Sequence, residues 1–364
     1  MVATAQRFNE LKPGTEISWS KRSLQEFADK SIEDLASEFD LLVIDHPWAG
    51  YAAHTGALIP LDEYLSEEFL SKQAMHSVGV SFQSYTFNNH QWALAIDAAT
   101  PVASSRKDLL LDKGLSLPTT FDELLSLAAK GLVVLPGIPL DTLMNFYMLC
   151  SAFGEDPFTK KTEVASKSVG TKALTALHTL GQLIDPECYQ FNPIQVYEAM
   201  SSTDKYAYCP FAYGYSNYSR QGYSHKVLHF HDLVEFAGTG KLKTTLGGTG
   251  IAISAMCKNI DKAIDYLSFI ASETCQQSLY FDNGGQPGHR KAWEDAHVNG
   301  NCRDFFKATL PALERAFLRP RYPNYMLFQD NAGHPIQHFM RYGGDPGIVL
   351  EEINALYVRS LNIN

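Results

Sequence analysis

The sequence predicts an α/β protein built from two lobes, and three observations support that class. The chain has 364 residues, which is enough for about two compact domains. Short apolar runs of strand length alternate with helical patterns, which is typical of mostly parallel sheets flanked by helices. The chain shows no single boundary, so we expect it to cross between the two lobes more than once.

Composition narrows the classes of function. The 30 basic and 40 acidic residues give a formal net charge of −10, which argues against nucleic acids and anionic membrane surfaces as partners. No apolar run reaches the roughly 18 residues that a membrane span needs. The N-terminal residues lack the features of a secretory leader, which predicts a cytoplasmic protein or a chain whose leader is missing. The six scattered cysteines are expected to be buried free thiols, with one or two disulfides possible if the protein is exported.

The first part of the chain has the elements of one lobe. Residues 3–11 have helical spacing and end at a Lys-Pro-Gly breaker. Residues 15–20 alternate like a strand, and residues 23–39 contain one or two helical stretches. Residues 40–44 form a continuous apolar run, typical of a strand buried on both faces. The loop after that strand, residues 45–50, lies where α/β sheets usually bind their ligands.

The remaining elements continue the alternation. Thr120 is the expected N-cap of a helix over 121–130, and Glu123 completes a capping box. Asp141 is the expected N-cap of the next helix, over 141–153. The other expected elements are helices at 172–183, 195–201, 260–271, 273–281, 334–341 and 346–360, strands at 131–135 and 249–254, and an extended stretch at 206–208 before a tyrosine-rich loop.

Three ordered groups of segments carry a family resemblance. The first group joins the buried strand and its loop, residues 40–52, to residues 56–64. The second group comprises residues 106–115 and 118–125, and the third comprises 247–254, 259–269 and 284–287. Together they resemble the family 1 extracellular solute-binding proteins, which are the maltose-binding-like receptors of ABC importers.

The resemblance implies the type II fold of periplasmic binding proteins, in which two lobes, each a mostly parallel sheet flanked by helices, are joined by hinge crossings. The N-lobe would comprise residues 1–102 and 255–319, and the C-lobe residues 103–254 and 320–364, with a ligand cleft between them. It also implies a monomeric periplasmic or extracellular receptor, without enzyme activity or cofactor, that captures a small polar solute by hinge closure. The solute would be a sugar or sugar derivative, with another small metabolite as the alternative, and the protein partner an ABC permease in the membrane.

Two departures from the family pattern stand out. The family has a strand ahead of the first helix, whereas this chain starts on that helix. The strand would lie between residues 15–20 and 40–44, and its absence predicts two unpaired strand edges. We therefore expect a start codon assigned too late or a shortened chain. At the first crossing, residues 103–105 are Ala-Ser-Ser where the family has bulky residues and a tyrosine, which leaves the subclass of ligand open.

Sugar sites combine flat aromatic rings with carboxylates and amides. By resemblance His46 and Trp48 match cleft-lining positions of the first lobe, although His46 could instead cap its loop and Trp48 could pack over its own lobe. Asp97 aligns with an acidic ligand contact just before the hinge. Asp141 is a further candidate, for which helix capping is the alternative explanation.

The second lobe supplies the aromatic candidates. Phe211 and Tyr213 match the stacking aromatics of the maltose-binding group, within an unusually tyrosine-rich segment that could alternatively pack on itself. The remaining candidate ligand residues are Tyr215, Gly247, Gly248, Gln286, Phe328 and Gln329. The two glycines would allow close approach of the main chain, although a hinge bend would need glycine as well.

Other classes of function have weaker support. A ferric-ion receptor of similar architecture could use Tyr213, Tyr215 and His46, but the chain lacks the adjacent tyrosines that such receptors use. An enzyme could use Asp97 and Asp141 as an acid–base pair, but no nucleophile is marked. His229 and His231 lie on one face of an extended segment and could chelate a metal, but no third ligand is evident, so a surface strand is favoured and no metal site is predicted.

Overall fold

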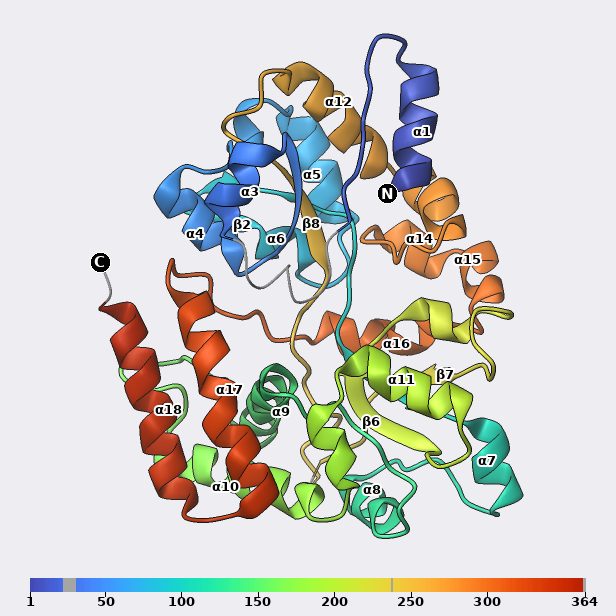
Figure 1. Ribbon diagram of the computed structural model, residues 1–364, viewed down its shortest axis with the longest axis vertical. Helices are drawn as coiled ribbons and strands as arrows, with labels where there is room; N and C mark the ends of the chain where they lie inside the picture. The colour runs from blue at the N-terminus through green and yellow to red at the C-terminus, as the bar shows by residue number, and fades with distance from the viewer. Residues whose placement is uncertain (22–30, 237, 363–364) are drawn as a thin grey trace. The chain divides into compact units, whose positions relative to one another are not determined.

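The computed structural model describes residues 1–21, 31–236 and 238–362, and its chain divides into two compact units (Figure 1). Unit 1 comprises Met1–Ala98, Gly247–Val298 and Arg321–Pro323, and unit 2 comprises Ala99–Leu246, Asn299–Pro320 and Asn324–Asn364. These bounds differ from the expected lobes in four places. Residues 247–254 and 321–323 group with unit 1, and residues 99–102 and 299–319 group with unit 2.

The sheet of unit 1 has the order β1-β8-β4, made of β1 (Leu41–Asp45), β8 (Thr249–Ile253) and β4 (Leu94–Ala95). β8 lies in the middle and runs antiparallel to both neighbours, which explains why residues 247–254 belong to this unit. The sheet therefore differs from the mostly parallel sheet that the sequence predicted. A short hairpin of β2 (Thr86–Phe87) and β3 (His90–Gln91) turns through two asparagines with positive φ, as a tight hairpin turn requires.

Strand β1 is covered on both faces, as its continuous apolar run predicted. Leu42 and Ile44 are buried in one core cluster, while Leu41 and Val43 pack against the other. The helices of unit 1 are α1 (Val2–Leu11), α3 (Ile32–Glu38), α4 (Trp48–Thr55), η1 (Leu61–Glu63), α5 (Glu67–Met75), α6 (Ser81–Ser84), α12 (Ile260–Ile270), α13 (Glu273–Cys275), η4 (Gln276–Tyr280), α14 (Arg290–Glu294) and the start of α15 (Ala296–Asn301).

The structure confirms several expected elements of unit 1 and changes one. The helix at 3–11, the strands at 40–44 and 249–254 and the helix at 260–271 are all present. Residues 15–20, expected as a strand, pair with no described strand. Of the expected helical region 23–39, residues 23–30 lie outside the described residues, and α3 occupies its second part.

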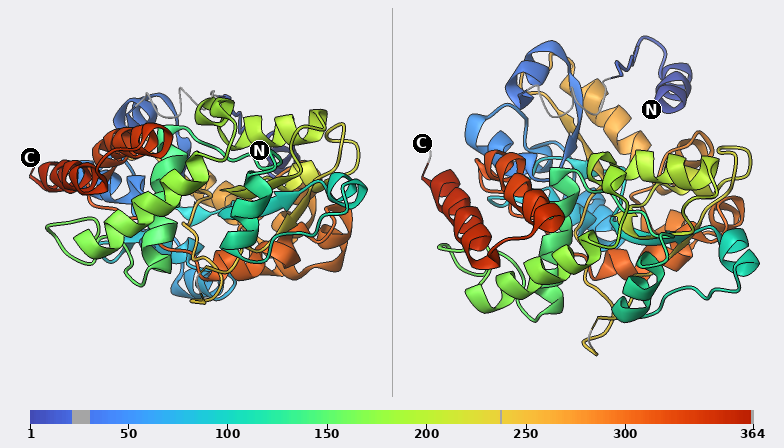
Figure 2. Two further views of the ribbon diagram at one scale, coloured as in Figure 1. Left: turned by 90° about the horizontal axis from the view of Figure 1, so that it is seen from below. Right: turned by 60° about the horizontal axis from the view of Figure 1, so that its bottom comes forward.

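Unit 2 has a second antiparallel sheet, β6-β5-β7, made of β6 (Tyr208–Tyr213), β5 (Pro101–Ser105) and β7 (His229–His231). Its helices are α7 (Lys107–Asp112), α8 (Phe121–Ala128), α9 (Pro139–Ala152), α10 (Lys167–Gly181), η2 (Pro186–Gln190), α11 (Pro193–Ser202), η3 (Ser216–Ser219), α16 (Phe305–Glu314), α17 (Tyr325–Tyr342) and α18 (Pro346–Leu361). Figure 2 shows α17 and α18 in red; α17 packs on α9 and α10, and α18 packs on α10 and α17. α16 packs on β7 and β5, so residues 299–319 belong to this unit.

Three expectations for unit 2 need correction. The capping box of Thr120 and Glu123 is present, but α9 starts at Pro139 and has Ile138 rather than Asp141 at its N-cap. β6 continues to Tyr213, through residues expected as a loop, because it pairs with β5. The strand expected at 131–135 makes only an isolated parallel bridge, from Val133 to Tyr208.

The six cysteines are free and buried, as the sequence predicted. Among the helices that the structure describes, none has the length and apolar character to cross a bilayer.

Candidate functional site

The structure brings three of the predicted ligand residues together in unit 1. Asp97 and Thr249 exchange main-chain hydrogen bonds of 3.1 and 3.2 Å, and Asp97 also bridges to Pro287. Gln286 is buried and its Nε2 donates to the carbonyl of Ala98 at 3.0 Å. Gly248 has a φ of +98°, and a Cβ there would lie 2.4 Å from the carbonyl oxygen of Asp97, so this approach requires glycine. Residues from three distant parts of the chain thus meet at one end of β8.

The carboxyl group of Asp97 has an unusual acidity. Burial raises its pKa to about 7, because an ionised carboxylate loses hydration there. The phenol of Tyr280 lies near Asp97. Burial raises the pKa of Tyr280, and the negative charge of Asp97 raises it further. Near neutral pH the carboxyl group is present in both protonation states, so it can donate a hydrogen bond to a hydroxyl or accept one.

His46 and Trp48 make contacts inside unit 1. His46 follows β1 and is buried, with its Nδ1 3.2 Å from Asp45 Oδ1 and its ring edge-on to Tyr85. Trp48 is the first residue of α4, and its ring lies 5.4 Å from that of Tyr51, edge to face. The Trp48 contact agrees with its alternative explanation, packing over its own unit, and the His46 contacts with the neighbouring Asp45 and with Tyr85 also lie within unit 1.

Unit 2 gathers the aromatic candidates at the end of β6. Phe211 is buried within the strand, whereas Tyr215, just beyond it, is 37% exposed. The hydroxyl of Tyr213 lies 3.1 Å from Thr245 Oγ1. Tyr197 of α11 supports this strand end, because its hydroxyl donates to the carbonyls of Ala212 and Tyr213 at 3.1 and 3.0 Å. Its ring also lies edge-on to Tyr215, at 6.2 Å.

Asp141 lies in the first turn of α9 and is buried. Burial raises its pKa to about 8, so the carboxyl group is largely protonated at neutral pH. Burial and the nearby Asp141 charge both raise the pKa of Tyr197, which places Asp141 near the tyrosine that supports the end of β6. The buried ring of Tyr197 thus lies near the Asp141 carboxyl and contacts the exposed ring of Tyr215.

Sequence reasoning missed Asn145, one helical turn after Asp141. Asn145 is 3% exposed, and its Nδ2 has no hydrogen-bond partner among the described residues. Its i, i+4 spacing from Asp141 on a mostly apolar helix was the signal that could have found it. A buried amide nitrogen without a partner is costly and can donate to a bound solute.

Phe328 and Gln329 of α17 are explained by packing and hydrogen bonding inside unit 2. The Phe328 ring lies 5.7, 6.0 and 5.8 Å from the rings of Phe158, Tyr325 and Tyr357. Gln329 is buried and its Oε1 accepts a hydrogen bond of 2.8 Å from Arg319 Nη1. Neither residue needs a solute to account for its position. Gly247, also buried, opens the segment of unit 1 that leads to Gly248.

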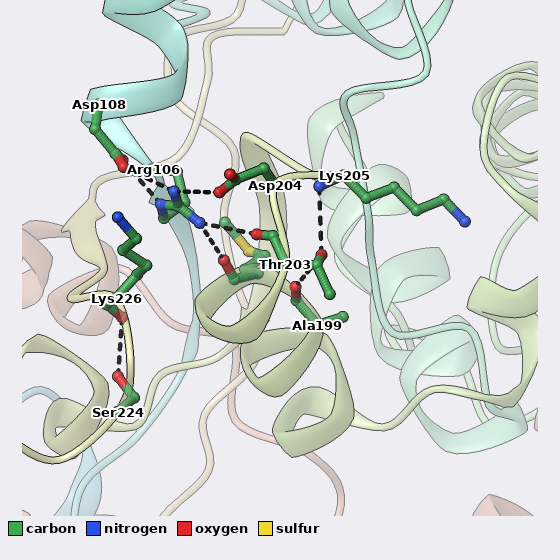
Figure 3. Close-up of polar contacts among 9 residues, drawn as sticks. Arg106, Asp108, Ala199, Thr203, Asp204, Lys205, Ser224 and Lys226 are labelled. Carbon is green, nitrogen blue, oxygen red and sulfur yellow. Dashed lines mark hydrogen bonds and ion pairs between the residues drawn. The ribbon is translucent and has the colours of Figure 1, made fainter.

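Arg106 fixes the helix that carries Tyr197 (Figure 3). Its side chain is 1% exposed and donates to the carboxylates of Asp108 and Asp204. Its Nη1 also donates to the carbonyls of Met200 and Thr203, both at 2.9 Å. These carbonyls belong to the C-terminal end of α11, where helix carbonyls lack partners of their own. Arg106 therefore ties α11 to the end of β5.

The residues that the structure describes include no group of three or more His, Cys, Asp and Glu side chains arranged to hold a metal ion. His229 and His231 lie on β7, as expected for a strand. His231 Nε2 lies 2.8 Å from Ser105 Oγ, and burial lowers the pKa of this histidine to about 4. Its ring is thus neutral and engaged in a hydrogen bond.

Known proteins with similar sequences and structures agree on one family. The family profile described as bacterial extracellular solute-binding protein matches residues 1–277. The maltotriose-binding protein of Pyrococcus abyssi is 28% identical over 126 residues, which are 35% of this chain and only 26% of that protein.

Three solved structures have the same fold. The maltose-bound MalE3 of T. maritima has a TM-score of 0.81 at 18% identity, covering 98% of this chain and 95% of that one. A ribitol-bound ABC transporter solute-binding protein of Agrobacterium radiobacter has a TM-score of 0.83 at 20% identity, covering 98% and 94%. The GacH receptor of Streptomyces glaucescens, solved without ligand and with acarbose, has a TM-score of 0.81 at 18% identity, covering 99% and 94%. These similarities confirm the predicted fold class, and since the profile matches well over half of the chain, the protein belongs to the bacterial extracellular solute-binding proteins.

Proposed function

We propose that the protein captures a small polyhydroxylated solute, a sugar or sugar derivative, and delivers it chemically unchanged to a membrane permease of an ABC importer. The observation that carries this proposal is the grouping of the exposed ring of Tyr215 with Tyr213, Tyr197 and the buried carboxyl of Asp141. Aromatic faces pack on the C–H face of a pyranose ring, while carboxyl and amide groups bind its hydroxyls. In unit 1, Asp97, Gly248 and Gln286 form a separate candidate group of polar contacts.

The acidities favour a neutral solute. The pKa values of about 7 for Asp97 and about 8 for Asp141 mean that neither carboxyl carries a full negative charge at neutral pH. A cationic amine would find little charge to pair with, whereas a hydroxyl can donate to or accept from a neutral carboxyl group. The relatives support the same class, because their names mention maltotriose, maltose, ribitol and acarbose. They do not favour the ferric-ion alternative.

We infer from the family that the protein works outside the cytoplasmic membrane, as a monomer and without a chemical reaction. Its relatives are binding proteins, and one solved neighbour is named as the solute-binding protein of an ABC transporter. Delivery then depends on a permease that recognises the loaded receptor.

The test is a thermal-shift screen of the purified full chain against sugars, polyols, organic acids, amines and ferric citrate. A ligand at a hundred times its Kd stabilises the folded state by about 2.7 kcal/mol, so we expect one sugar or polyol to raise Tm by several degrees. Chromatography of the incubated solute should show it unchanged. Stabilisation by ferric citrate or amines alone would overturn the proposed ligand class, and turnover of the solute would overturn the receptor role.

Variants locate the binding residues. Tyr215→Ala should weaken binding of the identified sugar roughly tenfold, because an aromatic contact contributes about 0.5–1.5 kcal/mol beyond its buried area. The matched control is Tyr64→Ala, which removes another exposed tyrosine, 45% exposed, from unit 1. Equal affinities of the two variants would show that Tyr215 does not contact the solute.

A further inference from the structure

A three-residue piece of chain belongs to unit 1 although the chain on both sides of it belongs to unit 2. The piece is Arg321–Pro323, and its neighbours Pro320 and Asn324 are both residues of unit 2. Because neither neighbour lies in unit 1, contacts of the three residues themselves must keep the segment there. Arg321 makes such contacts with both its side chain and its carbonyl group.

The side chain of Arg321 binds the turn that joins α6 to β2. Its Nη1 donates to the carbonyl oxygens of Gln83 and Ser84 at 2.8 and 3.1 Å, and also to that of Thr86. The first two carbonyls lie at the C-terminal end of α6, where helix carbonyls lack partners and attract a cation. Burial lowers the pKa of Arg321, so the guanidinium has lost part of its hydration in making these contacts. One side chain thus fixes the main chain on both sides of Tyr85.

Tyr85 connects this turn to the end of β1. Its side chain is buried, and its hydroxyl donates to the carbonyl of Ile44 at 3.0 Å. Its ring lies edge-on to that of His46, with 6.4 Å between the ring centres. A Cβ at Gly250 of β8 would lie 2.6 Å from the Cζ of Tyr85, so the ring has no room to move towards β8. A shift of Tyr85 would therefore disturb the contacts of Ile44 and His46.

The main chain of the same segment lies against α4. A Cβ at Gly50 would lie 1.3 Å from the carbonyl oxygen of Arg321 and 2.5 Å from its carbonyl carbon, so this contact requires glycine. α4 begins at Trp48, and the N–H of Ala49 in its first turn donates to the carbonyl of His46 at 3.0 Å. The loop between β1 and α4 is thus restrained at both of its ends by one three-residue segment, at β1 through the tyrosine and at α4 directly.

We propose that Arg321 is a positioning residue for solute capture, which fixes the loop between β1 and α4 through Tyr85 and Gly50. The proposal rests on the proposed receptor function, because it takes this loop, with His46 and Trp48, as part of the solute site. The chain on both sides of the segment belongs to unit 2. A solute that holds the loop in place therefore also holds the point at which the chain enters and leaves unit 1, and this coupling is reciprocal.

The first experiment compares Arg321→Met with the parent protein by NMR of the histidine imidazole groups, in the full chain and without solute. Methionine keeps much of the side-chain length and removes the donors. We expect the His46 signals to shift, whereas those of His297, an exposed histidine of unit 1, should stay in place. Arg321→Lys should restore part of the parent spectrum, because an ammonium group keeps the charge and three donors. Unchanged His46 signals in Arg321→Met would overturn the proposal.

The second experiment measures solute affinity and stability together, with the sugar or polyol that the thermal-shift screen identifies. We expect Arg321→Met to weaken binding about tenfold and Arg321→Lys to recover part of the loss. The matched control is Arg315→Met in unit 2, which removes another half-buried arginine that donates to two main-chain carbonyls, those of Leu242 and Pro311. It should lower the urea midpoint and leave the Kd unchanged. If Arg321→Met also lowers only the midpoint, Arg321 stabilises the fold without positioning the site, and the proposal is wrong.

Gly50→Ala tests the same contact from the side of α4. Its Cβ would force the main chain of Arg321 away from the helix, so we expect the His46 signals and the solute affinity to change as they do in Arg321→Met. Gly56→Ala, at the end of the same helix, places its Cβ in open space and should keep the parent affinity. Parent-like spectra and affinity in Gly50→Ala would contradict the proposal. The spectra need no solute, so they decide whether Arg321 positions His46 even if no sugar binds and the receptor function fails.

Discussion

The main chain at Gly248 approaches the carbonyl oxygen of Asp97 so closely that a Cβ atom would lie 2.4 Å from it. Gly248→Ala must therefore displace Asp97 or the end of β8, and the φ of +98° adds strain for any residue with a side chain. We expect the variant to lose tenfold or more in solute affinity, together with about 1–3 kcal/mol in the free energy of unfolding. Isothermal titration and urea denaturation measure the two effects.

The matched control is Gly14→Ala in the same unit. Gly14 also has a positive φ, of +85°, but nothing lies within 4 Å of a Cβ there. It should show the conformational strain without the loss of affinity. If both variants bind the solute as the parent protein does, the contact between Gly248 and Asp97 plays no part in binding.

The buried Asp141 makes stability depend on pH. Its folded-state pKa of about 8 lies well above the value of 3.8 for a free aspartate, so the folded state retains a proton that the unfolded chain releases. This contribution to stability is complete below about pH 4 and is lost as pH rises through 8, at about 1.4 kcal/mol per pH unit. Asp141→Asn should therefore be more stable than the parent at pH 9 by several kcal/mol.

Urea denaturation at pH 5, 7 and 9 measures this effect. Asp122→Asn, which changes an exposed carboxylate in the first turn of α8, is the control and should keep the pH dependence of the parent. An Asp141→Asn variant whose stability falls with pH as steeply as that of the parent would refute the assigned acidity.

His289 makes stability depend on pH in the opposite sense to Asp141, because its stabilising effect is lost in acid. Its ring stacks on His76 at 5.2 Å, and burial lowers its pKa to about 4, with His76 and Lys291 also lowering it and Glu273 opposing them. Because the unfolded histidine titrates near 6.5, stability is present above that pH and lost as pH falls towards 4. His289→Gln should flatten this loss, by about 3 kcal/mol at pH 4. Thermal denaturation between pH 7 and 4 tests it, with the exposed His54→Gln as control, and an unchanged acid sensitivity of the His289 variant would contradict the account.

The buried Arg106 is expected to stabilise the folded state through its hydrogen bonds to the end of α11. Arg106→Ala leaves the carbonyls of Met200 and Thr203 without their donor, which should lower the free energy of unfolding by about 3 kcal/mol. Arg106→Lys restores the charge but not the fork of five donors, so it should recover only part of the loss. Chemical denaturation distinguishes the three proteins, and equal stabilities would show that the buried guanidinium does not hold α11.

The sequence predicted elements that depend on local signals. The apolar run of residues 40–44 marked β1, and Thr120 with Glu123 marked the start of α8. Pairing between distant segments was not visible in the sequence. β6 extends through Phe211 because it pairs with β5, about a hundred residues earlier in the chain. The sheet of unit 1 is antiparallel because β8 pairs between β1 and β4 and runs opposite to both.

For the candidate site, the sequence identified individual residues but not the contacts that they make in the fold. The sequence identified Asp97, Gly248 and Gln286, which the structure groups around one end of β8. It could not show that Phe328 enters a cluster with Phe158, because that contact joins segments far apart in the chain. Burial of polar side chains also depends on the packed fold.

Isothermal titration of the purified full chain with the solute that stabilises it best decides whether this protein is a receptor for a sugar or related polyol. We expect saturable binding of one solute molecule per chain, weakened by Tyr215→Ala and Gly248→Ala but not by Tyr64→Ala or Gly14→Ala. Absence of saturable binding by any sugar or polyol, or binding that all four variants leave unchanged, would contradict this expectation.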